Sequence, residues 1–318
     1  MPDEGKGLLI TDIAARVTRL GSAWPCNEGC APFGKVILLS AEDDVADTIV
    51  PRLKAAGADL EQIEIVEMVR DNDKERMFSL VTDLELLRAK ITEVSDVKLV
   101  LIDPISAYLG VGKVDSYRTT DVRAVLAPVT KLAREFRSVF IGIMHFNKKV
   151  DVTNALLRIS DSLAFGATAR HVYAVIDDAE NKRKLLVKGK NNLSEPYQQA
   201  LAFTFSTRDV GVDAETGKPI RAPHIVWHTE YVDVTAVEAM QAATESRSPT
   251  ARDTAKNFLR EILANGPVNA AEIEEAAEAN KIADRTLRRA KDELGIIAKK
   301  DGPNGEWRWH LPATGEDQ

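Results

Sequence analysis

The chain has 318 residues, of which 44% are hydrophobic and 29% are charged, and its formal net charge is −7 at pH 7. This composition is typical of an ordinary globular protein and excludes a fibrous or disordered chain, and no apolar run is long enough to span a membrane. The length predicts one large domain and one small domain. The acidic balance does not indicate a general nucleic-acid binder, although local basic clusters can act within an acidic chain.

The N-terminus has acidic residues beside its first lysine and no apolar stretch that ends in a small-residue cleavage site. A secretory signal is therefore not expected, and we predict a cytoplasmic protein without a membrane partner. Cys26 and Cys30 are the two cysteines of the sequence. A structural zinc site would need about two further ligands close by, so the sequence does not predict one.

Apolar, β-branched runs alternate with amphipathic helical patterns in the first two-thirds of the chain, which is typical of parallel strands with crossover helices. Helices are expected near residues 7–19, 45–56, 74–93 and 117–136. Strands are expected at residues 35–40, 98–103, 138–145 and 170–177. Three further runs are expected to form antiparallel strands at a sheet edge, at residues 182–189, 200–205 and 224–229.

The later part of the chain changes in composition. Residues 238–250 are small and polar, as in a linker. Three short helical patterns follow, and then two strand-like runs around a Gly-containing turn predict a β-hairpin. We therefore predict an α/β domain over residues 1–237, a linker over 238–250, a winged helix-turn-helix domain over 251–312 and a tail over 313–318.

Gly5, Lys6 and Gly7 precede a helical pattern and correspond to the end of the phosphate-binding loop G-x-x-x-x-G-K-[ST]. In that loop, glycines let backbone N–H groups close around phosphate, the lysine neutralises it, and the hydroxyl holds Mg²⁺. Gly7 replaces the hydroxyl residue, and Thr11 lies one helical turn further along. The alternative for these residues is a solvated tail before a helix.

The first glycine of the loop pattern would fall just before Met1, and the strand that leads into the loop would lie further upstream. We therefore expect an N-terminally truncated or mis-started chain that lacks its first strand. A degenerate relative that binds nucleotide poorly is the other interpretation.

Three polar side chains follow strand-like runs. Glu42 follows the strand at 35–40, Asp103 ends the strand at 98–103, and His145 ends the strand at 138–145. The carboxyl ends of parallel strands line the ligand sites of α/β folds, so these side chains are expected to converge. The aspartate suits Mg²⁺, the glutamate can activate water, and the histidine can sense a γ-phosphate. The alternatives are a helix cap, a surface carboxylate and a hydrogen-bonded histidine at a sheet end.

This order of residues, Gly-Lys, Glu-Asp, Asp, His and then Arg, resembles the RepA-type hexameric replicative helicases of plasmids and phages, which are RecA-like P-loop ATPases of the AAA family. The resemblance covers residues 5–205, and its most specific part is ED-x-x-x-x-T-I-x-x-R-L at residues 42–53. It implies a RecA-like, mostly parallel sheet flanked by helices. The C-terminal module resembles winged-helix appendages of some relatives.

The resemblance also implies ATP and Mg²⁺ as cofactors, with Lys6 as the phosphate lysine, Glu42 as the catalytic carboxylate, Asp103 as the Mg²⁺ carboxylate and His145 as the γ-phosphate sensor. Arg170 matches the arginine finger, which stabilises charge at the nucleotide of a neighbouring subunit. An arginine that begins an edge strand and pairs with a surface acid is the alternative for Arg170.

Lys190 matches a lysine near the subunit interface of the family and is expected to bind nucleotide with Gly5, Lys6 and Gly7. Lys188 is the alternative register, and a solvated basic strand is the alternative role. The resemblance further implies a homo-oligomeric ring, such as a hexamer, whose core binds single-stranded DNA during replication of a mobile element. Whether the chain hydrolyses ATP is left open by its incomplete loop. The competing hypothesis is a catalytically silent DNA-binding regulator that uses the core as an oligomerisation scaffold.

The third helical pattern of the C-terminal module carries four cations: Arg285, Arg288, Arg289 and Lys291. A recognition helix uses such side chains to contact phosphates and base edges in duplex DNA, and this binding is salt-sensitive. The alternative is a protein-binding module whose arginines pair with neighbouring acids.

Overall fold

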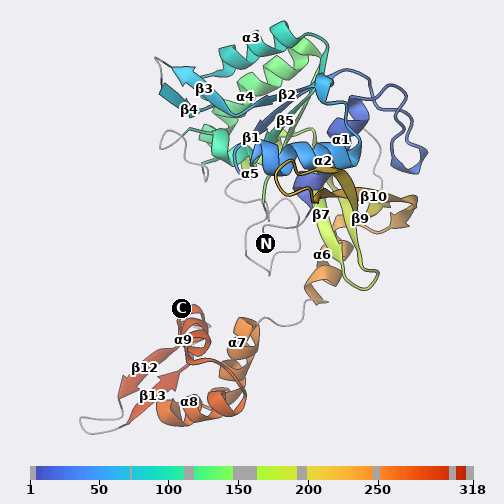
Figure 1. The fold of residues 1–318 in the computed structure, drawn as a ribbon. Coiled ribbons are helices and arrows are strands. Elements are labelled where there is room, and N and C mark those ends of the chain that lie inside the picture. The colour runs from blue at the N-terminus through green and yellow to red at the C-terminus, as the bar shows by residue number, and fades with distance from the viewer. Residues whose placement is uncertain are drawn as a thin grey trace. The chain divides into compact units, whose positions relative to one another are not determined.

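The computed structural model describes residues 5–71, 74–110, 118–145, 163–191, 199–245, 251–300 and 306–312. The chain divides into two compact units, Met1–Thr244 and Glu245–Gln318. Figure 1 labels the elements of both units.

A four-stranded parallel sheet forms the centre of the first unit. Its order is β2-β1-β5-β6, and its strands are β1 (Lys35–Ser40), β2 (Ile63–Val66), β5 (Val97–Asp103) and β6 (Val139–Gly142). Strands that are covered by helices on both faces are continuous apolar runs. The run at 35–40 follows this rule, because its four central residues are almost completely buried.

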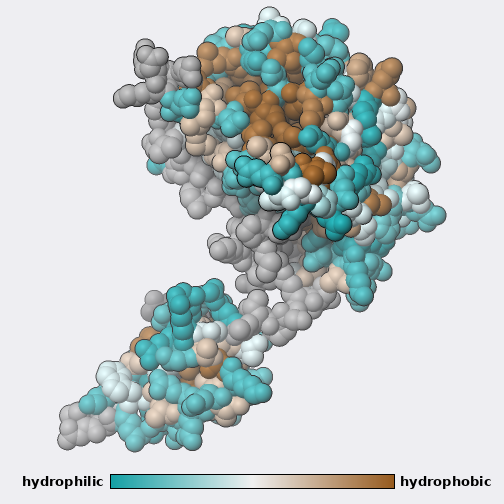
Figure 2. Space-filling model, viewed as in Figure 1, coloured by the Kyte–Doolittle hydropathy of each residue, from teal (hydrophilic) through white to brown (hydrophobic). Residues whose placement is uncertain are grey.

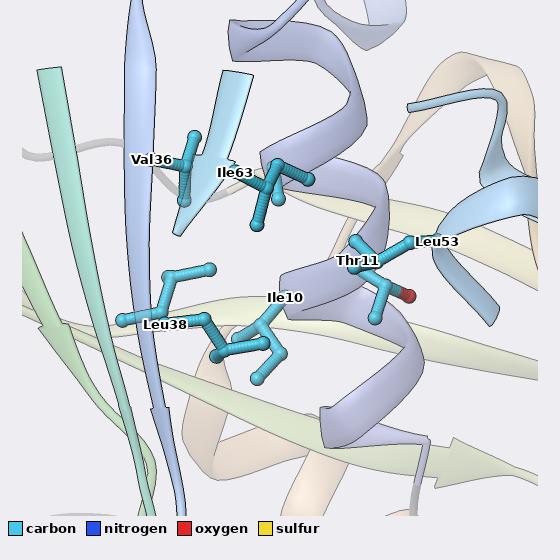
Figure 3. Close-up of a pocket in the computed structure, with 8 residues that line it drawn as sticks. Ile10, Thr11, Val36, Leu38, Leu53 and Ile63 are labelled. Carbon is cyan, nitrogen blue, oxygen red and sulfur yellow. The ribbon is translucent and has the colours of Figure 1, made fainter. Parts of the chain in front are cut away.

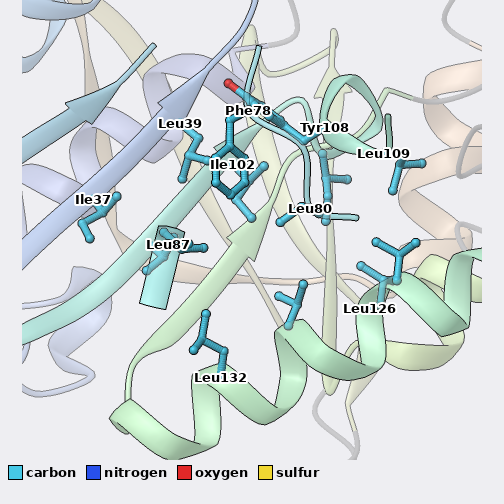
Figure 4. Packing of buried hydrophobic residues seen from close by; sticks show 14 of the residues in the cluster. Ile37, Leu39, Phe78, Leu80, Leu87, Ile102, Tyr108, Leu109, Leu126 and Leu132 are labelled. Carbon is cyan, nitrogen blue, oxygen red and sulfur yellow. The ribbon is translucent and has the colours of Figure 1, made fainter. Parts of the chain in front are cut away.

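Helices cover both faces of this sheet (Figure 1). One face packs against α1 (Lys6–Val17) and α2 (Val50–Ala56), which follows the π-helical turn Val45–Ile49. The other face packs against α3 (Leu84–Val94) and α4 (Thr119–Phe136) (Figure 4). Alternate residues of β1 point to opposite faces, so Val36 and Leu38 join the α1–α2 cluster, whereas Ile37 and Leu39 join the α3–α4 cluster. The predicted α/β class, with a parallel sheet flanked by helices, is confirmed.

An antiparallel sheet follows in the order β10-β9-β8-β7. Its strands are β7 (His171–Asp178), β8 (Arg183–Asn191), β9 (Gln199–Val212) and β10 (Pro219–Asp233). The helix α6 (Ala236–Glu245) contributes Ala239 and Met240 to the core of this sheet. The antiparallel pairing of β8, β9 and β10 was predicted, but these strands form a separate sheet and not an edge of the parallel one. The run at 170–177 was expected among the parallel strands, whereas β7 pairs antiparallel with β8. Strands β9 and β10 are also longer than the runs at 200–205 and 224–229.

Helix α1 joins the two sheets of the first unit. Its Leu9 packs with Phe203 and Ile225 of the antiparallel sheet, while other α1 side chains face the parallel sheet. The carboxylate of buried Asp12 accepts hydrogen bonds from Trp227 Nε1 and from Arg16 Nε, each at 2.8 Å. These contacts fix the start of α1 relative to both sheets.

The helix expected at 74–93 begins ten residues later. Residues Lys74–Met77 instead form β4, which pairs with β3 (Met68–Asp71), and α3 begins at Leu84. Buried Asp83 explains the boundary, since its carboxylate accepts from the Ser79 N–H at 2.9 Å and from Arg76 at 2.6 Å. These bonds hold residues 79–83 in a turn. The short strand β2 was not predicted.

Short elements complete the first unit. They are the 3₁₀ turns Pro25–Asn27, Leu60–Gln62 and Ile105–Tyr108 and the helix α5 (Leu163–Thr168). In Figure 2, hydrophobic surface gathers in the middle of the visible face of this unit. No helix within the described ranges is both long and apolar enough to cross a membrane.

The second unit combines helices with an antiparallel sheet. Its elements are α7 (Ala251–Ile262), β11 (Val268–Asn269), α8 (Ala270–Ala279), α9 (Asp284–Glu293), β12 (Ile297–Lys300) and β13 (Trp307–His310). The sheet order is β11-β13-β12, and β12 and β13 form the predicted hairpin. Leu259, Leu287 and Trp309 lie in its core.

Candidate functional site

The site begins at the N-terminus of α1. Gly5 caps this helix in the left-handed region (φ 80°, ψ 10°), where a side chain is disfavoured. A Cβ at position 5 would also collide with the ring of Phe205 from β9. The Gly5 carbonyl accepts from the Leu9 N–H at 2.9 Å, and Lys6 is the first helical residue. The first backbone N–H groups of a helix have no intrahelical partner and favour an anion.

The ends of β1 and β5 bring two acidic residues together. Ser40 is paired with Asp103, and the Ala41 N–H donates to the Asp103 carbonyl at 3.0 Å. Glu42 therefore follows directly beside the end of β5. His145 follows β6, the neighbour of β5, and its Nε2 lies 3.8 Å from a carboxylate oxygen of Glu42. Three side chains expected at strand ends therefore lie at one edge of the sheet.

Further charged residues surround Asp103 and belong to this cluster. Burial, together with the nearby carboxylates of Glu42 and Asp43, raises the pKa of Asp103 to about 6, while Lys6 and Arg52 act in the opposite direction. An acidic group whose ionisation is disfavoured in this way gains from a nearby cation. Lys6, Glu42 and Asp103 thus lie within one electrostatic neighbourhood, which fits a site for a cation and a phosphate together.

Position 7 faces these carboxylates. A Cβ placed on Gly7 would lie 3.9 Å from an Asp43 carboxylate oxygen and 4.0 Å from Asp103 Oδ2. It would lie 3.4 Å from Arg52 Nη1, which is ordinary contact. A side chain at this position would therefore begin close to the two acidic groups, but glycine supplies no hydroxyl there.

Thr11 does not replace the missing hydroxyl. Its Oγ1 donates to the Leu8 carbonyl at 2.9 Å, and its side chain is 5% exposed. Figure 3 shows Thr11 among apolar side chains of α1, β1 and α2, in a pocket with no room for water. This pocket is a packing contact between elements and not a ligand site.

The donor set fits Mg²⁺ held jointly with phosphate. Among the described residues, no group of three or more His, Cys, Asp or Glu side chains could hold a metal ion by itself. Mg²⁺, however, is commonly bound through one or two carboxylates, water and substrate phosphates. Asp103, with its raised pKa and two carboxylate neighbours, provides such a partial site.

Sequence reasoning missed Arg52 and Asp43 as site residues. Arg52 Nη1 donates to Asp43 Oδ2 at 2.6 Å. Both residues belong to the 42–53 stretch, whose turn through Val45–Ile49 into α2 directs Arg52 back toward the β1 end. The position of Arg52 in that stretch was the available signal.

Lys190 lies on β8, and Arg170 lies directly before β7, the neighbouring strand of the antiparallel sheet. The Lys190 ammonium donates to the carbonyls of Gly166 at 3.0 Å, Ala167 at 2.8 Å and Ala169 at 2.8 Å. All three of its N–H donors are therefore used near the end of α5. Exposed Arg170 comes next in the chain, directly before β7. Lys188 lies opposite Tyr173 on the neighbouring strand.

The cations of α9 in the second unit have different surroundings. Arg285, Arg288 and Arg289 are exposed, whereas Leu287 and Ala290 face the core. Arg288 Nε donates to Asp284 at 2.9 Å. Lys291 Nζ lies 4.2 Å from the ring centroid of Trp309, which is a cation–π contact. Lys291 therefore packs on the hairpin instead of projecting from the helix.

A basic hollow on the hairpin was not predicted. Its volume is about 350 Å³, and it is lined by Pro267, Lys299, Lys300, Arg308 and His310. Lys299 lies opposite Arg308, while the adjacent Ala298 and Trp309 pair packs against the core. The alternation of tryptophan with Arg308 and His310 in β13 could have indicated this face.

Comparison with known proteins agrees with the geometry of the first unit. Residues 1–151, just under half of the chain, match the family model described as an AAA domain, and this range contains Gly5, Lys6, Glu42, Asp103 and His145. No curated protein matches the chain. Residues 1–151 therefore carry an AAA domain, of the RecA-like P-loop ATPase class, and such a domain implies nucleotide binding, typically with Mg²⁺.

Proposed function

We propose that this protein is a RepA-like ATPase that acts as an ATP-dependent DNA helicase or replication motor of a mobile element. The observation that carries this proposal is the convergence of Lys6, Glu42, Asp103 and His145 at one edge of the parallel sheet, beside the start of α1. These residues come from four separate segments, and each has a side chain suited to one part of phosphoryl transfer.

Each residue has a role in this proposal. The start of α1 and Lys6 bind the phosphates, and Asp103 holds Mg²⁺, which neutralises phosphate charge when bound. Glu42, with 61% of its side chain exposed, orients the attacking water and accepts its proton. His145 contacts the terminal phosphate and is close enough to Glu42 to respond to its charge.

Hydrolysis is proposed to require a ring of subunits. Exposed Arg170 is the candidate arginine finger for the nucleotide of a neighbouring copy. Lys190 fixes the three carbonyls that precede Arg170 and thereby positions it at the start of β7. Lys190 is thus a positioning residue near the subunit interface and is not itself in contact with the nucleotide of its own subunit.

The second unit is proposed to be a winged-helix module that contacts duplex DNA, while the core binds single-stranded DNA. Its helix order and its β12–β13 hairpin support this proposal. Arg285 and Arg289 of α9 and the basic face of the hairpin supply cations for phosphate contacts.

Gly7 favours the second candidate, a catalytically silent scaffold attached to a DNA-binding module. Without a hydroxyl at position 7, one ligand of the usual Mg²⁺ site is absent. A silent core would still form oligomers and still present the second unit to DNA.

Mg²⁺-dependent ATP hydrolysis by the 318-residue chain distinguishes these candidates. It should be measured with and without single-stranded DNA, with Glu42→Ala as the test for contaminating ATPases and Glu61→Ala as an exposed control. Turnover that requires Glu42 and rises with DNA supports the motor. Absence of Glu42-dependent turnover in a folded sample contradicts the motor and favours the scaffold.

A further inference from the structure

We propose that Arg52 is a permanent cation of the phosphate site. Its guanidinium contacts the terminal phosphates and supplies part of the positive charge that Mg²⁺ provides in other phosphate-binding loops. The proposal rests on nucleotide binding at the site described above. It predicts that nucleotide affinity depends on Arg52 and only weakly on Mg²⁺.

The first argument is the space beside Gly7. Arg52 Nη1 lies 3.4 Å from the point that a Cβ of residue 7 would occupy. The same point lies 3.9 Å from an Asp43 carboxylate oxygen and 4.0 Å from Asp103 Oδ2, and in the loop pattern this position carries the serine or threonine. The guanidinium of Arg52 therefore lies next to the space that a side chain at position 7 would fill. A side chain at that position would contact Arg52.

The second argument is charge. The carboxylates of Glu42, Asp43 and Asp103 lie together, and Lys6 and Arg52 are the cations that lower the pKa of Asp103. Arg52 contacts the Asp43 carboxylate of this acidic group directly, at 2.6 Å. Arg52 therefore places a permanent positive charge where a phosphate-binding loop with a serine or threonine hydroxyl would bind a metal ion.

The third argument is the donor capacity of the guanidinium. An arginine side chain carries five N–H donors in a planar fork that matches phosphate. In the described part of the chain, its hydrogen bond goes to Asp43 through Nη1. With 26% of its side chain exposed, Arg52 is held by Asp43 while the rest of the fork can face a phosphate.

The fourth argument is the rigid support beneath Arg52. The neighbouring Leu53 is completely buried against β1 and α1, which anchors α2. Asp44 caps the preceding turn, since its carboxylate accepts from the Asp47 N–H at 2.8 Å. The guanidinium thus projects from a fixed helix, as a preorganised phosphate ligand requires.

The test is equilibrium binding of a non-hydrolysable ATP analogue to the full chain, in excess EDTA and in excess Mg²⁺. For the wild type, the dissociation constants in the two buffers should agree within about 3-fold. Arg52→Gln should weaken binding about 10-fold or more in EDTA, the size expected for one charge-assisted phosphate contact, and Arg52→Lys should recover part of it.

A second pair of variants examines the coupling to position 7. Gly7→Ser combined with Arg52→Gln restores the hydroxyl and removes the competing cation, so its binding should become strongly Mg²⁺-dependent. Lys54→Gln removes a positive charge from the exposed side of the same helix and should leave both constants unchanged. Thermal unfolding of each variant shows that it is folded.

The outcomes separate this inference from the proposed function. If the wild type binds the analogue but Arg52→Gln binds equally well, or if wild-type binding requires Mg²⁺, the role of Arg52 is wrong while nucleotide binding stands. If the folded wild type does not bind in either buffer, both proposals are wrong.

Discussion

The two units of this protein arrange their charges in different ways. In the first unit, Lys6 of α1, Arg52 of α2 and the adjacent Glu42 and Asp43 after β1 all act on the partly buried carboxylate of Asp103. In the second unit, the cations that are proposed to contact DNA lie on the surface of α9 and of the β12–β13 hairpin. A convergent cluster binds a ligand through a few precisely placed side chains, so each of them matters. A surface with dispersed cations binds through the sum of many weaker charge contacts. Single substitutions should therefore have larger effects in the first unit.

The largest effect is expected for Arg170→Ala. If Arg170 acts on a neighbouring nucleotide, its loss should lower ATP turnover by about 10³-fold or more and leave nucleotide affinity unchanged. Arg221→Ala, on an exposed pair with Asp209, is the matched control. Mixing Arg170→Ala with Glu42→Gln should restore part of the turnover, because some sites then combine an intact Glu42 with an intact Arg170. Failure of mixing to restore activity would contradict a finger in trans.

Asp103→Asn should have opposite effects on stability and on ATP turnover. Because the pKa of Asp103 is raised from 3.8 to about 6, the folded state holds this proton more tightly than the unfolded state. Ionisation therefore costs stability as pH rises from about 4 to 6, and the full cost persists above that window. Asparagine stays neutral and should raise the free energy of unfolding at pH 7.5 by about 1–3 kcal/mol after allowance for solvent screening.

Chemical denaturation of the nucleotide-free protein at pH 7.5 and pH 4 measures this difference, which should shrink at the lower pH. The same variant should lose Mg²⁺-dependent ATP turnover, because Asp103 is the proposed Mg²⁺ carboxylate. A variant that is less stable than the wild type at pH 7.5 would show that the Asp103 charge is compensated in the folded protein.

A smaller effect is expected for the basic hollow of the second unit. Lys299→Ala combined with Arg308→Ala should weaken duplex DNA binding about 10-fold at low salt and reduce the salt dependence of log K by about 1 to 2 units. Lys291→Ala should change DNA affinity less, because Lys291 packs on Trp309. Arg260→Ala on α7 serves as a control for net charge. Equal losses in all three variants would mean that the hollow has no special role.

The smallest effect is expected for Gly5→Ala. The left-handed conformation alone costs about 1 kcal/mol for a residue with a Cβ. Gly21→Ala is a matched control, since Gly21 also has a positive φ of 73° but has no atom within 4 Å of its Cβ position. Thermal unfolding should show a larger loss for Gly5→Ala, because Phe205 must also move. Equal losses would indicate that Phe205 moves at no cost.

The fold was predictable where a segment carries its own signal. The strands at 35–40 and 98–103 are uninterrupted apolar runs, and both occur as expected. Strand β2 has only four residues in an acidic sequence, so its pattern of apolar and polar residues is too short to predict a strand. The start of α3 depends on the bonds that Asp83 forms with Ser79 and Arg76, which are not local helix signals.

The candidate site was also predictable only in part. Strand ends indicated where Glu42, Asp103 and His145 would lie, and the structure brings these three side chains to one edge of the sheet. The contacts of Arg52 and Lys190 could not be predicted, because each depends on a helix end meeting another segment in three dimensions. Their roles in nucleotide binding and in subunit contacts stay predictions.

Nucleotide binding by Lys6→Ala tests the central claim most directly. Calorimetric titration of ATP into the Mg²⁺-loaded wild type and into this variant, in the same buffer, compares their affinities without any need for turnover. The convergent site predicts that the wild type binds ATP and that Lys6→Ala binds at least about 10-fold more weakly, the loss expected for one charge-assisted phosphate contact. Equal affinity in the two proteins, with both folded, would contradict a phosphate site at the start of α1.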